Sequence, residues 1–134
     1  MRRIDDPRRR LLLAAIGAAN EGDQCRHTFL PMEEEREAAP RCFQKEGLWA
    51  HLFDQDAERL RATAWRLGVR RVFIHRPCEP GQHVDLCGKP LGLAVLDAEE
   101  VRDEAELDRL MHLGAEAFGR QLNEERRRKA CTRS

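Results

Sequence analysis

The sequence is poor in the features that mark membrane, secreted and nucleic-acid-binding proteins. It has no tyrosine, aromatic residues make up only 5%, and 24 basic residues balance 24 acidic ones. No apolar run approaches the roughly 18 residues that span a bilayer. The run from Leu11 to Ile16 is too short for a secretory signal and lies among arginines. We therefore expect a cytoplasmic protein with no membrane association and no overall electrostatic attraction to nucleic acid.

Two further absences narrow the chemistry. The cysteine count is five, an odd number, and in a reducing compartment such thiols stay free or bind metal instead of forming disulfides. Glycine-rich phosphate loops are missing as well. Gly88-Lys89 lacks the preceding glycine and the following Ser or Thr of such a loop. A nucleotide-binding loop of that type is therefore excluded.

The length of 134 residues fits a single compact domain with a modest core. Residues 1–46 predict an N-terminal helical extension, with one helix starting after Asp6-Pro7 and ending near Gly22. Residues 47–134 predict an α/β core domain that ends in a long helix and a basic tail. We expect a small sheet of about three strands with helices packed on it.

The core domain shows a strand, helix, strand order. Residues 48–53 favour a strand, residues 57–67 carry apolar residues at helical spacing, and Gly68 ends that helix. Val69 to His75 predicts the second strand, which makes a parallel pair the expected arrangement. Residues 91–96 predict a third strand. A long helix follows from Asp103 with an apolar stripe on one side.

One stretch of thirteen residues concentrates the reactive side chains of the chain. It runs from His75 to Cys87 and contains two His, two Cys and one Asp. His75-x2-Cys78-x4-His83-x3-Cys87 offers four ligands of the kinds that zinc prefers. The spacing differs from that of common zinc fingers and ribbons. The sequence therefore predicts a zinc or other divalent metal site as one possibility, with free, partly buried thiols as the alternative.

The same stretch also favours acid–base or phosphate chemistry. His83 and Asp85 lie two residues apart, so on an extended segment both side chains point to one face. The carboxylate can orient the imidazole, or both groups can hold a divalent ion. A bound anion would be held by positive side chains of this region, Arg71, Arg76 and Lys89. A metal-dependent phosphoester hydrolase is the corresponding activity, and a cysteine nucleophile with a histidine base is a third alternative.

Residues 47–101 resemble a small family of unknown function from bacteria and their phages, marked by a His-aromatic-Asp motif that is usually His-Tyr-Asp. The matching residues are Trp49, His51, Asp54, Leu60, Ala64, Leu67-Gly68-Val69, Arg71, Phe73-Ile74, His83-Val84-Asp85 and Leu93-Ala94-Val95. Val84 replaces the usual aromatic residue, and Lys89 precedes the position of the family's Lys. The resemblance implies a phage- or plasmid-type accessory protein with His83, Asp85 and His51 in one site.

No catalytic set is complete in the sequence, so whether the protein is an enzyme is left open. We predict an accessory protein that acts as a binding or regulatory module for a protein or nucleic-acid partner through its Arg-rich ends. The phosphoester hydrolase and a structural zinc domain are the alternatives. Homodimerisation through the apolar stripe of the last helix, Leu107 to Leu122, is a further possibility.

Overall fold

The structure is a computed structural model that describes residues 1–96 and 98–132. Five strands and six helices are described in this part of the chain. In order they are β1 (Arg2–Asp5), α1 (Leu12–Asn20), β2 (Cys25–Phe29), α2 (Glu33–Ala38), α3 (Arg41–Gln44), β3 (Trp49–Phe53), α4 (Ala57–Arg66), β4 (His83–Cys87), α5 (Gly88–Leu96), β5 (Glu99–Glu100) and α6 (Glu104–Thr132). The mixed α/β class predicted from the sequence is confirmed.

The strands form one sheet in the order β4-β3-β2-β1-β5. β1 runs parallel to β2 and β5, whereas β3 is antiparallel to both of its neighbours. Successive side chains of a strand point to opposite faces, so the register divides the sheet residues into two sets. One face carries Ile4, Cys25, His27, His51, Phe53, His83 and Asp85. The opposite face carries Arg3, Asp5, Arg26, Thr28, Ala50, Leu52, Val84 and Leu86.

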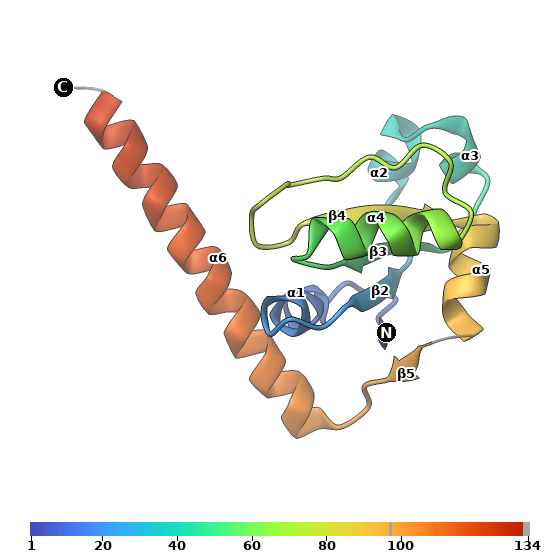
Figure 1. Cartoon of the computed structure of the whole chain (residues 1–134), viewed down its shortest axis with the longest axis horizontal. Helices are drawn as coiled ribbons and strands as arrows, with labels where there is room; N and C mark the ends of the chain where they lie inside the picture. Colours follow the sequence, from blue (N-terminus) through green and yellow to red (C-terminus); the bar gives the residue numbers. More distant parts are fainter. Residues whose placement is uncertain (97, 133–134) are drawn as a thin grey trace.

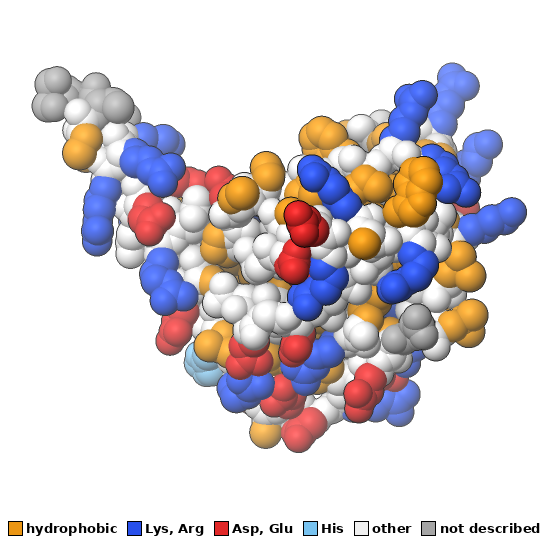
Figure 2. Space-filling model, in the orientation of Figure 1, with side chains coloured by type: hydrophobic (Ala, Val, Ile, Leu, Met, Phe, Trp, Pro, Cys, Tyr) orange, Lys and Arg blue, Asp and Glu red, His pale blue; other side chains and the backbone are white. Residues whose placement is uncertain are grey.

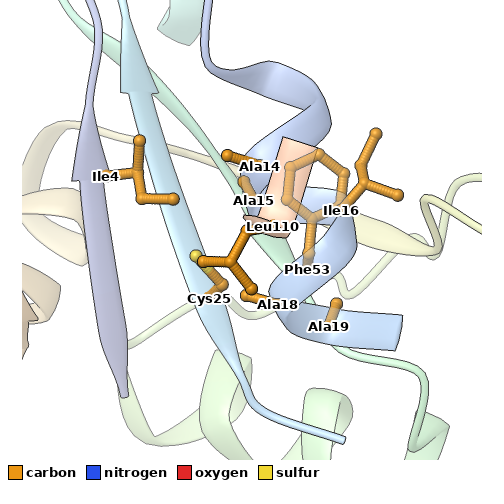
Figure 3. Packing of buried hydrophobic residues seen from close by; sticks show 9 residues of the cluster. All are labelled: Ile4, Ala14, Ala15, Ile16, Ala18, Ala19, Cys25, Phe53 and Leu110. Atoms are coloured by element: carbon orange, nitrogen blue, oxygen red, sulfur yellow. The ribbon is translucent and has the colours of Figure 1, made fainter. Parts of the chain in front are cut away.

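A core between α1, α6 and the sheet covers one end of the first face. Its buried residues include Ile4, Cys25 and Phe53 from the strands and Leu110 from α6, which meet the alanines of α1 (Figure 3). The two helices approach closely because glycines face each other. A Cβ on Gly17 would lie 1.9 Å from the Leu110 carbonyl oxygen, closer than any real Cβ contact. The small residues of α1 thus determine where the long helix lies.

The second core lies under α4 and α5 on the opposite face. Its buried residues are Ala50, Leu52, Leu60, Ala64, Leu67, Val84, Leu86, Leu91 and Ala94. α4 begins at Asp56, whose side chain accepts a hydrogen bond from the Arg59 amide, and ends before Gly68 at φ +94°. Buried Val84 belongs to this core, which explains why the middle residue of His83-Val84-Asp85 is apolar.

The long helix α6 packs against α1 and then continues beyond the sheet (Figure 1). Leu107, Met111 and Phe118 pack with the first core, whereas Leu122 is 50% exposed. Figure 2 shows the projecting end of α6 and, over the body, basic and acidic side chains interspersed with exposed hydrophobic ones. Within the described residues, no helix combines the length and the apolar character needed to cross a membrane.

Three secondary-structure predictions are wrong. The segment 1–46 is not only helical, because it supplies β1 and β2 to the middle of the sheet. These strands carry Arg2, Arg3 and Arg26. Charged residues are not typical of buried strands, so the sequence did not predict β1 and β2. Residues 91–96 belong to helix α5, whose first turn tolerates Pro90.

The predicted strand from Val69 to His75 is largely irregular. Only His75 forms a β-bridge, to His83, and Phe73 is 69% exposed. β-propensity depends on an available partner strand, and β4 pairs with this segment at a single position. The sheet therefore contains five strands, two of them from the first 46 residues, instead of about three.

Candidate functional site

A row of ionisable side chains crosses three neighbouring strands on the first face. His27 of β2 lies opposite His51 of β3, and His51 lies opposite Asp85 of β4. Directly opposed residues of antiparallel strands have Cβ atoms about 5 Å apart. His83 precedes Asp85 by two residues on the same face, as the sequence predicts. The register therefore assembles His51, His83 and Asp85, the three residues that the sequence proposed as catalytic.

His75 joins this group from outside the sheet. Its amide donates to the His83 carbonyl over 2.8 Å, and the His83 amide donates to the His75 carbonyl over 3.1 Å. The turn between His75 and His83 is held by the buried side chain of Gln82. Its Nε2 donates to the Asp54 backbone carbonyl, and its Oε1 accepts from the Cys78 backbone N–H. The imidazole rings of His75 and His83 stack with their centroids 5.0 Å apart. The bridge thus places a third histidine beside Asp85.

Asp85 is the centre of the group, because three imidazole nitrogens approach its carboxylate. His51 Nδ1 lies 3.1 Å from Oδ1, His83 Nε2 lies 3.4 Å from Oδ1, and His75 Nε2 lies 3.1 Å from Oδ2. Burial by itself would raise the pKa of Asp85, but the neighbouring His51 and His83 rings hold this pKa far below its usual range. Asp85 is therefore an anion at neutral pH.

Two neighbouring contacts fix the proton positions on the rings. A guanidinium only donates hydrogen bonds, and Arg9 Nη2 lies 3.2 Å from His51 Nε2. His51 Nε2 is then the acceptor, so the proton on Nδ1 is donated to Asp85. A carbonyl only accepts, and the Gly81 oxygen lies 2.7 Å from His83 Nδ1. The His83 proton is therefore on Nδ1.

With these proton positions, His83 Nε2 and Asp85 Oδ1 face each other without a proton between them. In the neutral His83 ring the lone pair on Nε2 points at a carboxylate oxygen 3.4 Å away, and two acceptors do not attract each other. A cation between them removes the conflict. It is either a second proton on His83 or a metal ion, since a histidine whose Nδ1–H is held by a carbonyl is a common metal ligand.

The spacing of the ligand atoms also fits a metal. The ligand atoms of His51, His83 and Asp85 all lie within 4.8 Å of one another. Two atoms bonded at about 2.0–2.1 Å to a tetrahedral zinc ion lie about 3.3–3.4 Å apart. The separations of 3.1 and 3.4 Å around Asp85 Oδ1 are close to that value. Among the described residues this group is the one with ligand atoms so close together.

Arg9 and His27 belong to the site, but the sequence placed neither of them beside His51. Arg9 takes a left-handed backbone conformation, φ +60°, that residues other than glycine rarely adopt. Its guanidinium lies 4.1 Å from the centroid of the Phe29 ring, and Nη1 pairs with Glu35 at 2.9 Å. Nothing in the sequence around Arg9 signals this role. The conformation of the chain before α1 brings it over the histidines.

His27 lies next to His51 and is fully buried. Neither of its ring nitrogens has a hydrogen-bond partner among the described residues, and Asp6 Oδ2 is 4.0 Å away. Burial, with a smaller contribution from His51, lowers the pKa of His27 to about 4. Burial also lowers the pKa of His51, partly offset by Asp85. Both rings are therefore neutral at pH 7. In the sequence, the alternation of Cys25, His27 and Phe29 was the signal for a strand with these three side chains on one face.

A pocket of about 780 Å³ opens beside the row. His75 and Asp85 line it together with Arg71 and Lys89. Neither Arg71 nor Lys89 forms an ion pair with another described residue, so both positive charges are available to a ligand. Aromatic walls come from Phe43, Trp49 and Phe73. The pocket thus combines an apolar surface with two cations, two carboxylates and the edge of the histidine group. Of the two carboxylates, Glu35 is paired with Arg9, and Glu46 is the other.

The remaining predicted site residues are not part of the group around Asp85. Arg76 is held by the Pro80 carbonyl and stacks on Phe118, and it does not line the pocket. Cys78 is exposed in the turn before β4 and is not part of the group around Asp85. Cys87 lines the pocket, but burial raises the pKa of its thiol to about 11. A protonated thiol is a poor ligand and a poor nucleophile.

Comparison with known proteins gives no match: no family model, curated protein or solved structure matches this chain. The resemblance to the family with the His-Tyr-Asp motif therefore stays a prediction.

Proposed function

We propose that the protein is a zinc-dependent phosphoester hydrolase whose metal is held by His83, Asp85 and His51. One observation carries the proposal: His83, whose Nδ1 contacts the Gly81 carbonyl, turns its Nε2 to the ionised carboxylate of Asp85 at 3.4 Å, and a metal ion between them would bind both. Two imidazoles and a carboxylate are a frequent ligand set of catalytic zinc, which keeps a further position for water. When bound, zinc lowers the pKa of that water so that hydroxide is available near neutral pH.

His51 can become the third ligand through a change that the site already allows. Its Nδ1 must lose its proton, and Nε2 must then take one. Arg9 would have to give up its contact with Nε2, and it has an alternative partner in Glu35, to which Nη1 is already paired at 2.9 Å. Zinc binding would therefore shift the His51 proton from Nδ1 to Nε2 and transfer Arg9 fully to Glu35.

The pocket supports phosphoesters as the substrate class. Arg71 and Lys89 supply positive charge for phosphate oxygens, and the aromatic wall supplies a surface for an apolar or aromatic alcohol group. In the reaction the oxygen of water bonds to phosphorus, and the bond from phosphorus to the alcohol oxygen breaks. His75, 41% exposed and paired with Asp85 Oδ2, is positioned to give the departing alcohol its proton.

The alternative role as a binding module has less support from the contacts. It relied on the Arg-rich ends, and three arginines of the N-terminal end are engaged within the fold. Arg2 pairs with Glu106, Arg3 with Glu100, and Arg9 with Glu35. Arg2 and Arg3 link β1 to α6 and β5, Arg9 links the segment before α1 to α2, and these three side chains are not displayed for a partner.

The test combines metal analysis with a hydrolysis assay. Protein dialysed against zinc should bind about one ion per chain and hydrolyse p-nitrophenyl phosphate or bis(p-nitrophenyl) phosphate. A chelator should abolish the activity, and added zinc should restore it. Asp85→Asn and His83→Gln should remove both zinc and activity. The exposed Asp108→Asn and His112→Gln serve as matched controls. Protein that binds no zinc and cleaves neither ester would overturn the proposal.

A further inference from the structure

A second pocket lies over the opposite face of the sheet, and a buried arginine forms part of its lining. Arg26 of β2 is 1% exposed, and its Nη2 contacts Asp5 Oδ1 at 3.4 Å. Its Nε and Nη1 are buried and have no hydrogen-bond partner among the described residues. The neighbouring Thr28 hydroxyl is also buried without a partner. Buried donors are rarely left unpaired, so this group calls for an acceptor.

The carboxylates around Arg26 are engaged by other groups. Asp6, which also lines the pocket, accepts from the Arg8 and Leu11 backbone amides. Asp5, the ion-pair partner of Arg26 among the described residues, is 42% exposed and also contacts Arg3 Nε at 3.4 Å. Glu100 is engaged by Arg3 and Arg102. Burial lowers the pKa of Arg26, which is the sign of a charge held in a poorly compensating environment. Arg3, Arg26 and Arg102 share the carboxylates of Asp5 and Glu100, and a further anion would supply a partner for the unpaired Nε and Nη1 of Arg26.

The pocket above this group has a volume of about 360 Å³. Its polar lining comes from Arg26, Thr28, Arg3, Asp5 and Asp6, and its walls are apolar. Pro7, Leu30, Leu48, Leu91 and Val95 make up those walls. Leu30, Leu48 and Val95 are 49%, 48% and 42% exposed. The pocket therefore offers donors on the sheet side and an apolar rim toward solvent, at the small end of the range for ligand sites.

We propose that this second pocket, here called the Arg26 pocket, binds a small organic carboxylate with an aliphatic tail. The planar carboxylate accepts two hydrogen bonds from a guanidinium, and the Thr28 hydroxyl supplies a third donor. The tail lies against the leucines of the rim. The proposal is independent of the zinc site, because β2 presents Arg26 and His27 to opposite faces of the sheet.

Hexanoate is a suitable probe, with hexanol and hexylamine as matched ligands that lack the anion, and inorganic phosphate as an anion that lacks the tail. Binding is measured on the full chain by titration calorimetry. Hexanoate should bind and raise the unfolding midpoint, whereas the three control ligands should bind at least tenfold more weakly. Equal binding of hexanol would show that the apolar rim alone is responsible, and this would overturn the proposal.

Three variants locate the site. Arg26→Met removes the charge but keeps an unbranched side chain, and should weaken hexanoate binding about tenfold or more. Leu48→Glu places a negative charge on the exposed rim, where it should not disturb folding, and should also prevent binding. Leu93→Glu, equally exposed but outside the pocket, is the control and should bind normally. Unchanged binding by Leu48→Glu would refute the location even if Arg26→Met does not fold.

Discussion

His27 should make the fold sensitive to mild acid. In the unfolded chain a histidine takes up a proton near pH 6.5, whereas burial lowers the pKa of His27 in the folded protein to about 4. Between these two pH values the unfolded state binds more protons than the folded state. Lowering the pH through this window therefore reduces the free energy of unfolding, and the contribution of neutral His27 is fully present only above about pH 6.5.

The size of the effect follows from the two pKa values. With pKa values of about 6.5 and 4, the free energy of unfolding falls by about 2 kcal/mol between pH 7 and pH 5, and by at most about 3.4 kcal/mol at lower pH. Asp85 does not contribute in this window, because a carboxylate with a lowered pKa loses its stabilising effect only below its unfolded value, near pH 4. His51 acts in the same direction as His27.

Urea unfolding of chelator-treated protein at pH 7 and pH 5 measures this change. His27→Phe keeps a ring beside Phe29 and His51 but cannot be protonated. Its loss of stability between the two pH values should be smaller than that of the wild type by about 2 kcal/mol. The exposed His112→Gln should behave like the wild type. Equal pH dependence of wild type and His27→Phe would show that His27 is not the buried neutral base described above.

Two other predictions concern the helix contact and the zinc site. Gly114→Ala would bring a Cβ to 2.0 Å from the Leu13 carbonyl oxygen, so α6 must move away from α1. Thermal unfolding should show a loss of roughly 3 kcal/mol or more, while Gly119→Ala, which meets no neighbour, should be tolerated. Arg9→Met removes the positive charge beside His51 Nε2 and should tighten zinc binding several-fold in a competition titration. Weaker zinc binding in this variant would contradict the role given to His51.

The site was predicted in part because strand geometry is local. Two residues separated by one lie on the same face of any strand, so His83 and Asp85 were placed together without knowledge of the fold. The same rule places Cys87 on this face as well, and only the structure shows that its thiol lies outside the group around Asp85. The resemblance suggested His51, and the register of β3 with β4 brings it to Asp85.

The remaining site residues depend on long-range pairing. His27 approaches His51 only because β2 pairs with β3 in one particular register, and a shift by one residue would turn it to the other face. Arg9 reaches His51 across 42 positions of the chain through a backbone conformation that sequence patterns do not signal. Arg26 was obscured for a related reason, since a charged residue rarely predicts a buried strand.

The sequence by itself determined the α/β class, strand β3, the helices near 12–20 and 57–66, the long last helix, and the shared face of His83 and Asp85. These features follow from periodicity, capping residues and glycine stops, which act within a few residues. Only the tertiary structure decided that β1 and β2 lie inside the sheet, that three histidines meet at Asp85, and that Arg26 is buried. Those outcomes depend on which strands pair and in what register, because pairing is selected by packing over the whole domain.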